Sequence, residues 1–152
     1  KQVRENLYNK FNEQKVSENR LIFLGETKTR RELLETYNKI DIALDPFPFQ
    51  GNTSTCEAVW MGIPVLTLKG DRFLFHFGES INANLDMKEW IALNGEDYVS
   101  KAVKFSSNCD KLAEIRKNLR KTALNSPVFD AIRFSNFFGN MLWEMWKSFK
   151  LK

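Results

Sequence analysis

Apolar residues occur along the chain in two patterns, regularly spaced positions and short continuous runs. These two patterns mark the predicted elements. Val3, Leu7 and Phe11 recur every four residues among charged side chains, which predicts an amphipathic first helix. Short apolar runs instead predict strands, at residues 21–24, 40–44, 65–68 and 90–93, the last at a sheet edge.

Helices are predicted between and after these strands. Thr29 is a candidate cap for the first of them, Gly62 ends the second, and Asn94 is a candidate cap for the fourth. The predicted helices cover residues 30–38, 56–61, 70–81, the stretch after 94, 110–124 and the stretch from 130. The order α, β, α, β, α, β predicts an α/β fold with a parallel sheet and right-handed crossovers.

The last helix has a broad apolar stripe at spacings of three and four. This pattern predicts a closing helix that lies across the sheet, with an interface for a partner domain as the alternative. The stripe comprises Phe134, Phe137, Phe138, Met141, Leu142, Met145, Trp146 and Phe149.

Composition narrows the classes of protein. A length of 152 residues predicts one domain over residues 1–152. The net charge of +4 is spread along the chain, which argues against a nucleic-acid partner, and no apolar run is long enough to span a membrane.

Cys56, Cys109 and one His offer no zinc cluster, and two free thiols suit the reducing cytoplasm. Because the chain begins with Lys1, we expect a piece of a longer protein.

The central stretch DIALDPFPFQGNTSTCEAVWMGIPVLTL, residues 41–68, reads as strand, loop, helix and strand. A Gly/Ser/Thr loop that opens a helix presents free backbone N–H groups to an anion, so this is a candidate phosphate site. The alternative is a capping box, in which Ser54 and Glu57 only bond the helix start. Neither a Walker A motif nor a GxGxxG fingerprint is present.

Three loops are predicted to meet at the carboxyl edge of the sheet, where ligands of such folds bind. They are residues 25–29, 45–55 and 69–73, and they carry the cations Lys28, Lys69 and Arg72. His76 follows on the same rim. His76 is a candidate hydrogen-bond donor to a phosphate or a candidate general acid. The alternative is a packed side chain among aromatic neighbours.

Several ordered motifs carry a family resemblance. The stretches DIALDPFPFQGNTSTCEAVWMGIPVLTLKGDRF, EWIALNGEDYVSKAV, LAEIRKNLR and SPVFDAIRFSNFF resemble the carboxyl-terminal part of O-GlcNAc transferases of the SPINDLY type, over about residues 20–149. The resemblance implies the Rossmann-like carboxyl-terminal lobe of a two-lobed GT-B glycosyltransferase, usually preceded by tetratricopeptide repeats. Such enzymes transfer N-acetylglucosamine from a UDP-sugar to Ser or Thr with inversion, without a metal or other cofactor.

The resemblance also implies roles for single residues. Catalytic groups and the acceptor site are expected in an amino-terminal lobe outside these residues, so the fragment alone is expected to be inactive. Three positions depart from the family pattern: Leu33 replaces a common His, His76 a common Arg, and Asn52 a His or Thr. The implied contacts are Gly51, Asn52, Thr53 and Ser54 to the UDP diphosphate, Glu57 to the ribose, and Lys28 and Arg30 beside the uracil.

Two other functions stay open at this point. One is a GT-B glycosyltransferase with another sugar or acceptor, including the side chain of asparagine. The other is a non-enzymatic α/β domain that binds a partner protein through its aromatic last helix. Binding of a nucleic acid is a more distant alternative.

Overall fold

The computed structural model describes residues 2–45 and 47–150. Their contacts form two compact units, Lys1–Glu32 and Leu33–Lys152. The single domain expected from the chain length stays a prediction.

The first unit contains helix α1 (Gln2–Glu13), as the period of four predicts, and a 3₁₀ turn, η1 (Glu18–Arg20). The strand predicted over residues 21–24 is wrong, because this segment has no regular structure. Instead the Phe23 ring packs edge-on against Tyr8 of α1, with the ring centroids 5.0 Å apart. A short apolar run does not distinguish a strand from a segment that packs one aromatic ring on a helix.

Helix α2 (Arg30–Thr36) begins where the sequence predicts. The amide of Glu32 donates to Thr29 Oγ1 at 3.2 Å, which confirms Thr29 as the cap. The helix ends earlier than expected, because its last turn tightens into the 3₁₀ turn η2 (Tyr37–Lys39).

The second unit is built on a parallel sheet of order β1-β2-β3, which confirms the predicted class. Ala43 pairs with Val65, and Thr67 pairs with Ile91. The first strand is shorter than residues 40–44, because only its last two residues lie opposite β2. The third strand lies at an edge, as predicted. The strands are β1 (Ala43–Leu44), β2 (Val65–Leu68) and β3 (Ile91–Ala92).

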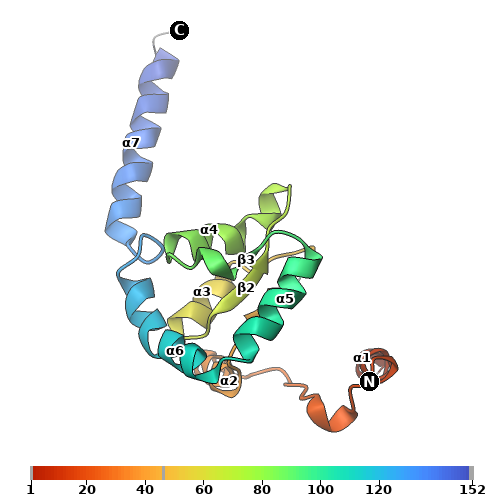
Figure 1. Ribbon diagram of the computed structural model, residues 1–152. Helices are drawn as coiled ribbons and strands as arrows, with labels where there is room; N and C mark the ends of the chain where they lie inside the picture. Colours follow the sequence, from red (N-terminus) through yellow and green to blue (C-terminus); the bar gives the residue numbers. More distant parts are fainter. Residues whose placement is uncertain (1, 46, 151–152) are drawn as a thin grey trace. The chain divides into compact units, whose positions relative to one another are not determined.

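Helices cover β2 on both sides, and Figure 1 shows β2 running between α5 and the pair α3 and α4. The segment predicted as one helix over residues 70–81 is a 3₁₀ turn followed by α4. The elements are α3 (Thr53–Trp60), η3 (Phe73–Phe75), α4 (Phe77–Asn84), η4 (Lys88–Trp90), α5 (Gly95–Ser106), α6 (Cys109–Leu124) and α7 (Ala131–Lys150).

The core lies where α3, α4 and α6 meet β2. Val59, Ile63, Leu66 and Trp90 are each fully buried there. The Trp90 ring also stacks on Phe105 of α5, with the ring centroids 4.1 Å apart. This core fixes β2 and the helix starts at its carboxyl end, which is where the candidate site lies.

Two predicted boundaries are confirmed, one by backbone conformation and one by a hydrogen bond. Gly62 has φ +78°, a conformation that suits glycine, and α3 ends just before it. Asn94 caps α5, because its side-chain oxygen accepts from the Asp97 amide at 2.9 Å.

Helix α7 does not close the fold. All of its residues are exposed, including Phe138 at 45% and Trp146 at 48%. The expectation that α7 lies across the sheet is therefore wrong. An amphipathic pattern shows that a helix has an apolar face, but not which surface covers that face.

Candidate functional site

The carboxyl ends of β1 and β2 lie side by side, because the two strands are parallel neighbours. The chain leaves β1 through residues 45–52 and enters α3. It leaves β2 through residues 69–76 and enters α4. Two helix starts are therefore brought to one edge of the sheet, as expected for a parallel α/β fold.

The start of α3 presents backbone amides that the helix does not use. The first helical hydrogen bond runs from the Cys56 amide to the Asn52 carbonyl, at 3.0 Å. The amides of Thr53, Ser54 and Thr55 precede this bond, so they have no acceptor within the helix. Asn52, Thr53 and Ser54 are exposed. This arrangement can bind an anion, with the helix dipole adding attraction.

The capping box predicted as the alternative does not form. The residue that flanks the helix is Asn52, not Ser54, and its side chain makes no capping bond. The Glu57 side chain bonds a different group: its Oε2 accepts from the Tyr37 hydroxyl at 3.2 Å. The helix begins earlier than predicted, because Gly51 is held in place and its carbonyl accepts from Thr55 Oγ1 at 2.8 Å.

Gly51 has a different role from the residues after it. Its amide donates to Asp45 Oδ1 at 2.7 Å, so this amide is already used. A Cβ atom at Gly51 would lie only 2.5 Å from Ser54 Oγ. A side chain at residue 51 would therefore displace the Ser54 and Thr55 hydroxyls at the helix start.

Asp45 is a residue that the sequence reasoning missed. It is 4% exposed, and its second oxygen, Oδ2, accepts from Thr67 Oγ1 at 2.7 Å. Burial raises the pKa of Asp45, and its hydrogen bonds to Gly51 and Thr67 act in the opposite direction. An acidic residue directly after an apolar strand was the available signal.

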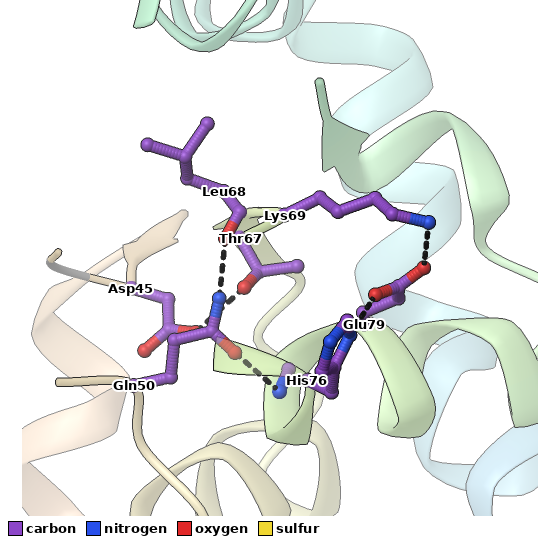
Figure 2. Close-up of polar contacts among 8 residues, drawn as sticks. Asp45, Gln50, Thr67, Leu68, Lys69, His76 and Glu79 are labelled. Carbon is purple, nitrogen blue, oxygen red and sulfur yellow. Dashed lines mark hydrogen bonds and ion pairs between the residues drawn. The ribbon is translucent and has the colours of Figure 1, made fainter. Parts of the chain in front are cut away.

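Gln50 was also missed, and it joins the two loops. Its Nε2 donates to the Leu68 carbonyl at the end of β2, and its Oε1 accepts from the Gly78 amide at 3.0 Å. Figure 2 shows this side chain beside Asp45 and Thr67. No sequence pattern distinguishes such a glutamine from an exposed loop residue.

Lys69, His76 and Glu79 form a cluster on the rim after β2 (Figure 2). Glu79 Oε1 lies 2.7 Å from Lys69 Nζ, and Glu79 Oε2 lies 2.6 Å from His76 Nδ1. The hydrogen bond from Lys69, assisted by the one from His76, lowers the pKa of Glu79 against the opposing effect of burial. His76 is thus held by a carboxylate and is not simply packed among aromatic rings.

Lys28 and Arg30 belong to the first unit, Lys1–Glu32, and both are exposed. The amide of Lys28 donates to Glu32 Oε2 at 2.8 Å. Their predicted part in the site stays a prediction.

A cavity of about 290 Å³ lies beside β1 and the start of α3. It approaches the lower end of the range found for small-molecule sites. Its walls are mainly apolar. The lining residues are Tyr37, Ala43, Leu44, Asp45, Phe49, Gly51, Ser54, Thr55, Ala58 and Val65.

Within residues 2–45 and 47–150, no group of three or more His, Cys, Asp or Glu side chains is placed to hold a metal ion. No helix in the same ranges combines the length and apolar character that crossing a bilayer requires.

Comparison with known proteins agrees with the fold. The sequence profile of glycosyl transferase family 41 matches residues 2–137. A solved structure of a mutant O-GlcNAc transferase from Thermobaculum terrenum superimposes with a TM-score of 0.86 at 29% identity, and covers 95% of this chain and 28% of that one.

Curated relatives give the same result. A probable UDP-N-acetylglucosamine–peptide N-acetylglucosaminyltransferase SPINDLY from Hordeum vulgare is 34% identical over 113 residues, 74% of this chain. The corresponding protein of Solanum lycopersicum is 30% identical over 116 residues. This chain spans 12% of the length of each. The profile match over most of the sequence shows that the chain belongs to glycosyl transferase family 41.

Proposed function

We propose that this chain is the donor-binding part of a protein O-linked N-acetylglucosaminyltransferase of the GT-B type, and that UDP-GlcNAc binds at the start of α3. The observation that carries the proposal is the set of three amides, from Thr53 to Thr55, that precede the first helical bond at the carboxyl edge of the sheet. A diphosphate offers the acceptors that these amides lack.

The proposed chemical role of this site is electrostatic stabilisation of the leaving group. Transfer of the sugar leaves negative charge on UDP, and preorganised amides at a helix start stabilise such charge. No metal or other cofactor is needed for this step in the proposal. Glu57, in the second turn of α3, would accept hydrogen bonds from the ribose hydroxyls.

The acceptor is proposed to be a Ser or Thr hydroxyl of a protein, bound by an amino-terminal lobe of the parent polypeptide, which also supplies the catalytic groups. Tetratricopeptide repeats are the proposed further partner of that lobe. The cytoplasm is the proposed compartment, and the free thiols of Cys56 and Cys109 suit its reducing conditions.

The test is thermal unfolding of the chain with UDP, AMP or inorganic phosphate. UDP at a hundred times its dissociation constant should stabilise by about 2.7 kcal/mol. For a chain of this size that is a rise in Tm of about 5–10 °C. Equal shifts with all three ligands would reduce the proposal to a general anion site, and no shift with UDP would contradict it for this chain.

One substitution is expected to weaken UDP binding without lowering the stability of the chain. Ser54→Asp places a carboxylate in the first turn of α3, where it favours the helix but repels a diphosphate. We expect the Tm without ligand to be maintained and the shift with UDP to disappear. Asn118→Asp adds the same charge to an exposed position of α6 and should leave the UDP shift unchanged.

A second function has one observation in its favour. The apolar side chains of α7 are exposed, Phe137 at 64% and Met145 at 60% among them. We propose that they contact a protein partner, in the first place the amino-terminal lobe. Replacing Met145 with Asp should then abolish that association and leave UDP binding by this chain unchanged.

A further inference from the structure

The buried side chain of Gln50 connects the two loops of the site. Gln50 is 1% exposed although it lies in a loop. Both ends of its carboxamide are used: Nε2 donates to the Leu68 carbonyl, and Oε1 accepts from the Gly78 amide at 3.0 Å. A side chain with this burial and these two bonds has little freedom to move.

These bonds join three element ends. Gln50 directly precedes Gly51 and the start of α3, Leu68 is the last residue of β2, and Gly78 lies in the first turn of α4. Gly78 stands two residues after His76 and one before Glu79, which bind each other. One side chain therefore ties the helix-start amides of α3 to the segment that carries the His76 cluster.

The contact is tight on the α4 side as well. A Cβ atom at Gly78 would lie 2.5 Å from Asp45 Oδ2 and 2.3 Å from Thr67 Oγ1. Gln50 thus holds the start of α4 in place where Gly78 lies close to Asp45 and Thr67. If the carboxamide were removed, the Leu68 carbonyl and the Gly78 amide would each lose a buried partner.

We propose that Gln50 is a positioning residue of the donor site. It holds the starts of α3 and α4 at a fixed separation, so that a diphosphate bound to the α3 amides orders the His76 segment as well. The identity of the ligand rests on the function proposed above, whereas the coupling of the two segments does not.

Gln50→Glu gives the sharpest test, because it changes one atom and its effect depends on pH. An ionised carboxylate still accepts from Gly78 but repels the Leu68 carbonyl and the buried Asp45 carboxyl beside it (Figure 2). A protonated carboxyl donates to Leu68 and accepts from Gly78, as the glutamine does. UDP affinity is measured by calorimetry at pH 7.5 and pH 5, each variant against the wild type at the same pH.

We expect Gln50→Glu to bind UDP about tenfold more weakly than the wild type at pH 7.5, and to approach wild-type affinity at pH 5. The matched control is Asn82→Ala. Asn82 is equally buried, and its Nδ2 donates to the Val65 carbonyl at 2.9 Å, within the core. This control should lower stability without weakening UDP binding in a pH-dependent way.

Amide hydrogen exchange provides the second measurement. At pH 7.5 Gln50→Glu should exchange faster than the wild type over both residues 52–56 and residues 76–80, whereas a merely local effect would appear on one side only. Tenfold weaker binding with exchange altered in both segments supports the inference. Unchanged affinity, or a change confined to one segment, overturns it.

A failure of the donor-site proposal gives a different result from a failure of the positioning role of Gln50. If the wild type does not bind UDP, that proposal fails, and exchange alone decides the role of Gln50. Simultaneous loosening of both segments then supports the positioning role, and loosening of one segment contradicts it.

Discussion

The Asp45 carboxylate accepts a hydrogen bond from the Gly51 amide at 2.7 Å, across the loop that joins β1 to α3. Because Asp45 is buried, this bond forms in a medium of low polarity and holds the loop firmly. The Gly51 amide is therefore not available to an anion. Its bond to Asp45 instead fixes the start of α3, where Asn52, Thr53 and Ser54 are exposed.

Stability should depend on the charge of Asp45. Burial raises its pKa above the ordinary value of 3.8, so between the two values the folded state holds a proton that the unfolded state has released. Its contribution to stability is thus complete below pH 3.8 and falls as pH rises through the folded pKa. The free energy of unfolding, measured in urea from pH 3.5 to pH 7, should fall relative to Asp45→Asn. A parallel pair of pH curves would contradict this.

Glu79 should show the opposite dependence. Its pKa is lowered from 4.5, mainly by the bond from Lys69, so its contribution is present above pH 4.5 and is lost as pH falls through the folded pKa. Unfolding in urea should show the wild type more stable than Glu79→Gln at pH 6, with the difference disappearing on acidification. A constant difference between the wild type and Glu79→Gln across this pH range would contradict the prediction.

Gly78→Ala should destabilise the chain by about 1–3 kcal/mol, because the added Cβ would overlap Thr67 Oγ1 and Asp45 Oδ2. Gly139→Ala is the matched control. It lies within α7, where a Cβ meets nothing within 4 Å, and should stabilise by about 0.5–1 kcal/mol. Thermal unfolding of both variants measures the difference, and equal effects would show that the start of α4 can move.

Phe138→Ala should change the stability of the chain by less than about 0.5 kcal/mol, because Phe138 of α7 is 45% exposed. Leu119→Ala, at a position 2% exposed in α6, should cost about 2–5 kcal/mol. A comparable cost at both positions would mean that α7 is covered in solution. Repeating the unfolding at several protein concentrations would then identify a second copy as the cover.

The sequence was a good guide wherever the signal was local. The period of four in α1, the cap at Thr29, the glycine after α3 and the cap at Asn94 all lie within a few residues of the structure that they specify. The alternation of helices and strands was equally sufficient for the parallel sheet.

Local patterns misled where two readings fit the same residues. Residues 21–24 are apolar enough for a strand, but Phe23 packs on α1 instead. Ser54 and Glu57 have the spacing of a capping box, yet the helix starts before Ser54 and Glu57 binds the Tyr37 hydroxyl. Spacing alone does not record which partner is nearer in space.

By itself, then, the sequence determined the α/β class, the family and the position of the candidate loop at residues 51–54, because these depend on periodicity and on motifs that are contiguous in the chain. Tertiary structure alone decided that Gln50 and Asp45 hold that loop, that Glu79 joins Lys69 to His76, and that α7 leaves its apolar face exposed. The physical reason is distance along the chain. Gln50 and Gly78 are 28 residues apart, and only the pairing of parallel strands brings the ends of β1 and β2 together so that such groups can meet.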